Sequence, residues 1–100
     1  MDWETVVRVA SELVDGAGKD LEDARALRTA QGDATRGRTL NAAEIDQRQR
    51  ARRVLVRRLT ELRAQKDLLT TAPATVPGRD RGLKNLDQRM LAIKEELNSA

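Results

Sequence analysis

The arginine side chains of residues 36–66 are the groups in this sequence best suited to binding chemistry. This stretch carries 10 basic and 3 acidic side chains, a net charge of +7, and nearly all of its cations are arginines. A guanidinium group offers five N–H donors in a planar fork that matches carboxylate and phosphate oxygens. The side chains predicted to contact a partner protein or a nucleic acid are Arg48, Arg50, Arg52, Arg53, Arg57 and Arg58.

The sequence gives little indication of a catalytic site, a metal site or a disulfide. The sequence contains no cysteine and no histidine, which excludes disulfides, thiolate nucleophiles, Cys/His zinc sites and imidazole acid–base catalysis. The carboxylates of Asp20, Glu22 and Asp23 lie close together, but they lack the glycine-turned loop of a calcium site and are interpreted as a solvated helix face. No nucleophile–base set is recognisable. We therefore expect no catalytic activity, no cofactor, no metal and no small-molecule substrate.

Length and composition indicate a small domain with a thin aliphatic core. The 100-residue chain has 39% hydrophobic residues, but only 1% aromatic residues against 35% charged ones. A single helical domain spanning residues 1–100 is expected for this length. No run approaches the roughly 18 apolar residues of a membrane span, and the acidic, polar beginning differs from a signal peptide. A cytoplasmic location without membrane contact is the expectation.

The first third of the chain carries apolar side chains at alternating steps of four and three residues, beginning at Trp3. This period predicts a helix over about residues 3–31, with Asp2 as its N-cap. Gly16 and Gly18 each cost about 1 kcal/mol relative to alanine inside a helix, so the helix either breaks there, with Asp20 capping a second piece, or continues with a weak spot. The apolar stripe stays in phase across both glycines, which favours one continuous helix. Trp3 is interpreted as a core anchor, with an interface hot spot as the alternative.

The second predicted helix, over about residues 42–70, has the clearest start signal. Asn41 is expected to cap it, and Glu44 stands where it can complete a capping box. The second half of this helix carries leucines at heptad spacing, whereas the first half is polar nearly all round. Two i,i+4 ion pairs are expected to support the polar half: Glu44–Arg48 and Asp46–Arg50.

A third helix is predicted over about residues 81–98, and connectors are predicted at residues 32–40 and 71–80. The apolar stripes of the second and third helices have equal lengths, which predicts an antiparallel C-terminal hairpin with the first helix covering one side. The expected fold is therefore all-α, with the basic start of the second helix projecting beyond the hairpin. The side chains expected to pack between the helices are Trp3, Val7, Leu55, Leu59, Leu62, Leu83, Leu86, Met90, Ile93 and Leu97.

The uneven charge layout leaves three explanations open. Residues 1–35 have a net charge of −4, residues 36–66 of +7, and residues 67–100 of 0. The arginines could form a solvated helix face, could complement the acidic first helix within a chain or between subunits, or could contact phosphates. The favoured function is a non-catalytic helical interaction or assembly module that self-associates or packs on a helical partner. The alternative is a small nucleic-acid-binding regulator that uses the arginine-rich start of the second helix.

Overall fold

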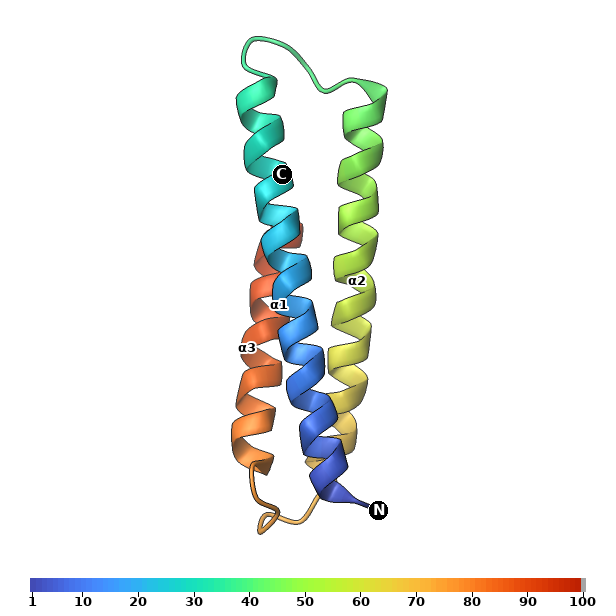
Figure 1. Ribbon diagram of the computed structural model, residues 1–100, viewed down its shortest axis with the longest axis vertical. Helices are drawn as coiled ribbons and strands as arrows, with labels where there is room; N and C mark the ends of the chain where they lie inside the picture. The colour runs from blue at the N-terminus through green and yellow to red at the C-terminus, as the bar shows by residue number, and fades with distance from the viewer. Residues whose placement is uncertain (100) are drawn as a thin grey trace.

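The computed structural model describes residues 1–99, which form three helices and no strand. Helix α1 spans Trp3–Ala34, α2 spans Ala42–Thr70 and α3 spans Arg79–Asn98. Each helix runs antiparallel to the one before it, in an elongated bundle of 56 × 17 × 17 Å (Figure 1). The predicted all-α fold with a C-terminal antiparallel hairpin is confirmed.

The helices begin where their capping groups lie. At the start of α1, the side chain of Asp2 accepts a hydrogen bond from the Thr5 N–H at 3.3 Å. At the start of α2, the Asn41 side chain accepts from the Glu44 N–H, and the Glu44 carboxylate accepts from the Asn41 N–H, both at 2.9 Å. The predicted capping box is therefore present. The residue before α3 is Gly78, whose φ of 81° is the left-handed conformation that glycine adopts without strain.

The first connector begins later than predicted. Helix α1 continues through Gly32, so the connector occupies residues 35–41 instead of residues 32–40. A glycine ends a helix when it adopts a positive φ, and Gly32 does not; the positive φ of 77° belongs to Gly37. An exposed helical glycine costs only about 1 kcal/mol, which the remaining turn of α1 tolerates.

The second connector is shorter than predicted, because α3 begins at Arg79 and leaves residues 71–78 between the helices instead of residues 71–80. The Arg79 side chain donates hydrogen bonds to the carbonyl oxygen of Ala72 at 3.0 Å and to that of Thr70 at 3.2 Å. These bonds satisfy carbonyl groups near the end of α2 and fix the first residue of α3 against it. The hairpin therefore closes two residues earlier than its sequence pattern indicates.

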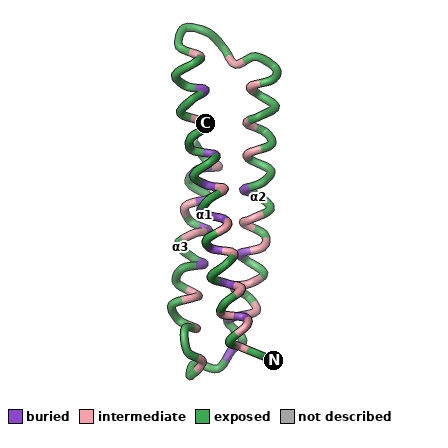
Figure 2. Tube along the Cα trace, in the orientation of Figure 1, coloured by how far each residue is buried: buried purple, intermediate pink, exposed green. Residues whose placement is uncertain are grey.

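The core is a strip of aliphatic side chains along the bundle axis (Figure 2). Helix α1 contributes mainly small side chains, with Ala10, Ala17 and Ala24 buried, so it lies close to the other two helices. Five of the predicted packing residues are buried: Leu55, Leu62, Leu86, Met90 and Ile93. The other five are partly buried against the core: Trp3, Val7, Leu59, Leu83 and Leu97.

Helix α1 passes through Gly16 and Gly18 without a break, as the phase of its apolar stripe predicts. A Cβ atom at Gly16 would lie 3.0 Å from Nη2 of Arg58, and one at Gly18 would lie 2.9 Å from Cζ of Arg89. Each glycine therefore leaves room for a guanidinium group that crosses the surface of α1. From the sequence alone, these glycines only destabilise the helix. In the structure, they allow arginine side chains to approach the α1 backbone closely.

The start of α2 is expected to weaken in acid. The two hydrogen bonds from Arg38, at 2.8 and 3.0 Å, and the one from the Asn41 N–H lower the pKa of Glu44 from 4.5 to about 2. Because this pKa is lower in the folded than in the unfolded state, the stabilisation is complete above about pH 4.5 and is lost as the pH falls toward about 2. The thermal midpoint of Glu44→Gln, followed by circular dichroism, should lie below that of the wild type near neutral pH and approach it in acid. A difference that stays constant with pH would contradict this assignment.

Candidate functional site

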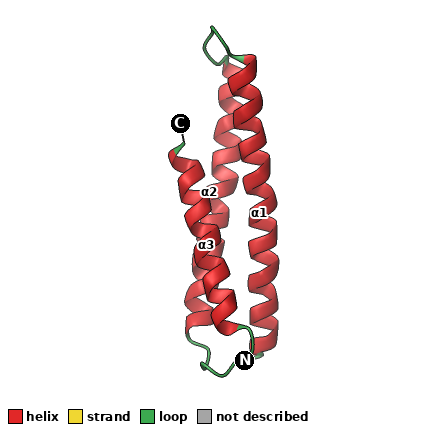
Figure 3. Ribbon diagram, turned by 90° about the vertical axis from the view of Figure 1, so that its left-hand side faces the viewer, coloured by secondary structure: helices red, strands yellow, loops and turns green. Residues whose placement is uncertain are grey.

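The end of the bundle that carries the α1–α2 connector contains only two helices. The last turn of α3 lies beside Arg28 of α1 and Arg52 of α2, and both helices continue past it toward their connector (Figures 1 and 3). At 1.5 Å per residue, they extend roughly 10–15 Å beyond this level. We call residues 25–53 the open end. The prediction that the start of α2 projects beyond the hairpin is correct with respect to α3, but it omits α1, which accompanies α2 over this length.

Positive charge is concentrated in the open end. Residues 25–53 carry 8 basic and 3 acidic side chains, a net charge of +5, whereas the rest of the chain sums to −2. Each of the three carboxylates already has an arginine partner within the open end. These pairs are Asp33–Arg36 at 3.8 Å, Glu44–Arg38 at 2.8 Å and Asp46–Arg50 at 2.5 Å. Within residues 1–99, no carboxylate pairs with Arg48, Arg52 or Arg53.

One of the two predicted i,i+4 ion pairs is wrong. Asp46 pairs with Arg50 as expected, but Glu44 binds Arg38 instead of Arg48. The capping box ties the Glu44 carboxylate to the N–H of Asn41, which directs it toward the connector where Arg38 lies. Arg48 instead lies near the last turn of α3.

A groove runs between α1 and α2 where α3 ends. Its apolar lining comes from Ala24 and Leu55, which are buried, and from three side chains that are half-buried: Leu27, Ala51 and Leu97. Its charged lining consists of three arginines and one carboxylate: Arg28, Arg48, Arg52 and Glu96. The groove therefore combines a partly exposed aliphatic surface with cationic edges.

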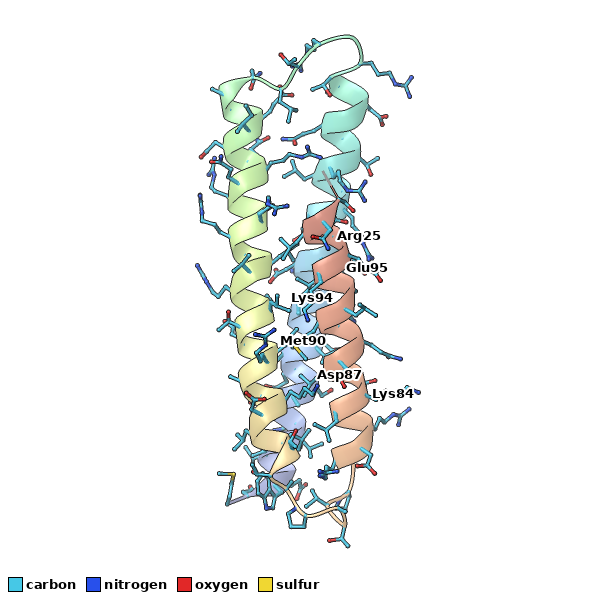
Figure 4. All side chains as sticks on the ribbon, turned by 180° about the vertical axis from the view of Figure 1, so that it is seen from behind. Arg25, Lys84, Asp87, Met90, Lys94 and Glu95 are labelled. Atoms are coloured by element: carbon cyan, nitrogen blue, oxygen red, sulfur yellow. The ribbon has the colours of Figure 1, made fainter. Side chains whose placement is uncertain are left out.

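The last turn of α3 is held against the groove by arginines. The Glu96 side chain is only 8% exposed, and its carboxylate accepts hydrogen bonds from Nε and Nη2 of Arg28 at 2.8 and 3.3 Å. Arg25, which lies beside the last turns of α3 (Figure 4), approaches the same carboxylate at 3.7 Å. The hydrogen bond and the charge of Glu96 raise the pKa of Arg28 above its ordinary value. Arg52 donates to the carbonyl oxygen of Leu97 at 2.7 Å, so it caps α3 from a neighbouring helix.

Polar groups join α1 to α2 within the open end. Gln31 is buried, and its Nε2 donates to the carbonyl oxygen of Glu44 at 2.9 Å and to Oε1 of Gln47 at 3.3 Å. Its own Oε1 accepts no hydrogen bond from residues 1–99. A buried acceptor without a donor costs about 1–3 kcal/mol, so this contact stabilises the helix pair less than a leucine layer would.

The six arginines predicted as contacts occupy three different settings. Arg58 is half-buried between α2 and α1, where its Nε is 2.6 Å from Oδ2 of Asp20 and its Nη1 is 3.3 Å from Glu61. These interactions raise the pKa of Arg58, with the Asp20 hydrogen bond as the largest cause, and they join α2 to α1. The two arginines that line the groove are Arg48 and Arg52. The remaining three are exposed on the outer face of α2: Arg50, Arg53 and Arg57.

Six residues of the groove were not identified from the sequence as part of a site: Ala24, Leu27, Arg28, Ala51, Glu96 and Ser99. A signal for the groove exists in the helix lengths, which are 32 residues for α1, 29 for α2 and 20 for α3. Two long helices and one short helix cannot cover each other along their whole length. The unmatched length predicts an uncovered face, although it does not predict which side chains form it.

Comparisons of this chain with protein-family models, with curated proteins and with solved structures give no significant match. Over residues 1–99, none of the helices has the length and apolar character needed to cross a membrane. The same residues bring together no group of three or more acidic, histidine or cysteine side chains that could hold a metal ion. The geometry and charge of the open end are therefore the features of this protein that bear on its function.

Proposed function

We propose that this protein is a non-catalytic interaction module that binds a helix of another protein subunit at its open end. The observation that supports the proposal is the aliphatic groove between α1 and α2, left uncovered where α3 ends. Helices bury their apolar faces against other elements, and an amphipathic helix laid in an apolar groove is a recurrent mode of recognition. A helix placed in line with α3 would continue the three-helix packing over the open end.

The charge of the open end supports the same proposal. Its net charge of +5 contrasts with the −2 of the rest of the chain, so a partner of opposite charge would meet one end of the bundle in preference to the other. Complementary charge of this kind steers association and fixes orientation more than it adds affinity.

Nucleic-acid binding is the alternative function. The observation that favours it is the strip of Arg50, Arg53 and Arg57, which successive helical steps place together on the outer face of α2. Arg50 already pairs with Asp46. The one aromatic side chain, Trp3, is the first residue of α1 and lies far from the α1–α2 connector, where it cannot stack on a base bound at this strip.

A photo-crosslinking experiment in the native host tests the two functions together. Benzoylphenylalanine would replace Leu27 in the groove and, as a matched control, exposed Ala64 on α2 outside the open end. We expect a protease-sensitive adduct at position 27 that is at least about fivefold stronger than at position 64. Equal labelling at both positions would contradict the interaction module. A nuclease-sensitive adduct from a probe at Arg57 would favour the alternative.

A further inference from the structure

We propose that the helix bound at the open end is an acidic amphipathic helix of a partner protein, lying in the groove as a continuation of α3. This inference rests on the proposed function and specifies the chemistry of the partner. It follows from the charge that the groove leaves uncompensated, from the length of the uncovered helices and from the poor fit of a second copy of this chain.

The groove has more guanidinium groups than it can neutralise. Its single carboxylate, Glu96, already binds both Arg28 and Arg25. Arg48 pairs with no carboxylate of residues 1–99, and Arg52 donates to a neutral carbonyl group. Hydrogen bonds between guanidinium groups and carboxylates are about twice as strong as neutral ones and are often bidentate. Glutamate or aspartate side chains on the incoming helix would therefore match the edges of the groove.

The spacing of the arginines indicates where those carboxylates belong. Arg48 and Arg52 are four residues apart on α2, so they stand one helical turn apart on the same face. Two acidic residues four positions apart on an antiparallel helix would reach both guanidinium groups. The uncovered length of roughly 10–15 Å accommodates about 7–10 residues of helix. Leu27 and Ala51 lie at the level of the last turn of α3, so the side chains at the end of the incoming helix nearest α3 should be aliphatic.

A second copy of this chain fits the groove poorly. Two open ends that faced each other would each bring a net charge of +5, and like charges oppose association. The exposed large aliphatic side chains on α2 do not supply a free acidic apolar face. Val54 and Val56 are flanked in sequence by Arg53 and Arg57, and the carboxylates beside Ile45 already pair with Arg38 and Arg50. The acidic residues of α1 belong to a helix whose apolar face is already buried in its own bundle.

Binding of a defined peptide tests this inference. The probe is a capped helical peptide of about 14 residues with leucine along one stripe and glutamate at i and i+4 beside it, and the control peptide carries lysine at every glutamate position. Using isothermal titration calorimetry at about physiological salt, we expect micromolar binding of the glutamate peptide to the full chain. The lysine peptide should bind at least about tenfold more weakly, because it meets the arginines with like charge. Equal binding of the two peptides, or binding of neither, would overturn the inference.

Matched variants locate the bound peptide. Arg48→Glu should weaken binding of the glutamate peptide by at least about tenfold, because it places a carboxylate at the edge of the groove. Arg63→Glu makes the same charge change on the same helix, outside the open end, and should alter the affinity by less than about twofold. Arg48→Gln removes the charge without reversing it and keeps the test valid if Arg48→Glu fails to fold. An equal loss in the Arg63 variant would show non-specific attraction and overturn the inference.

The two proposals fail in different ways. A protein adduct at Leu27 together with no binding of the glutamate peptide would retain the interaction module and reject the acidic partner helix. The absence of both results would reject both proposals.

Discussion

Replacing Leu62 with alanine is expected to lower the free energy of unfolding by about 2–5 kcal/mol, the range measured for buried leucines that leave a cavity. Leu62 is 0% exposed and belongs to the core strip of α2. Domains of this size are stable by only about 5–15 kcal/mol, so the loss would be a large part of the total. Urea unfolding followed by circular dichroism measures it directly.

The matched control is Leu91→Ala on α3. Leu91 is 58% exposed, so its truncation should change the free energy of unfolding by no more than about 0.5 kcal/mol. Similar losses for the two variants would mean that α2 and α3 do not face each other as the structure shows. A large loss at Leu91 alone would place the core on the opposite face of α3.

Replacing Arg58 with alanine is the second change with a large expected effect. Its side chain is 28% exposed and that of Asp20 is 23% exposed, so removal of the guanidinium leaves a partly buried carboxylate without its 2.6 Å hydrogen bond. Loss of one partner of a buried hydrogen bond costs about 1–3 kcal/mol, and we expect a decrease in the free energy of unfolding within this range.

The same variant reveals the role of Gly16. Alanine is favoured over glycine by about 1 kcal/mol inside a helix, but in the wild type its methyl group would lie 3.0 Å from the Arg58 guanidinium. Gly16→Ala should therefore stabilise the Arg58→Ala protein by about 1 kcal/mol and the wild type by less. A double-mutant cycle should show a coupling of at least about 0.5 kcal/mol between the two positions. Gly32→Ala, which meets no heavy atom within 4 Å, should give the same gain in both backgrounds, and additivity at Gly16 would contradict the close approach.

Local sequence patterns predict most of the fold because the features that determine it lie within a few residues of each other. The capping box at Asn41 needs only Glu44, three residues away. The antiparallel register of α2 and α3 follows from the matched stripes. It agrees with the 2.6 Å ion pair between Lys66 and Asp87 and with the close approach of Gly82 to Leu69.

The candidate site is harder to predict because its parts come from distant segments. Arg28 and Glu96 are 68 residues apart in sequence, and neither has a local signal that indicates the other. Arg58 and Arg48 are both arginines of α2. Asp20 of α1 holds Arg58 at the contact between the two helices, whereas Arg48 lines the groove. Residue type and helical phase therefore predict an arginine-rich helix. Which of its arginines contact α1 and which line the groove depends on how α1 packs against α2.

In the proposed complex, the arginine contacts at the end of α3 would also determine which molecule bears the conformational entropy of binding. Helix termini ordinarily fray, but Arg25, Arg28 and Arg52 fix the last turn of α3 through Glu96 and the Leu97 carbonyl. This wall of the groove is therefore preorganised, and little of its motion remains to be lost when a partner binds. A partner segment that is disordered when free would bear most of the ordering cost. The lifetime and strength of the complex would then follow the helix propensity of the partner segment, which could be tuned without any change in this protein.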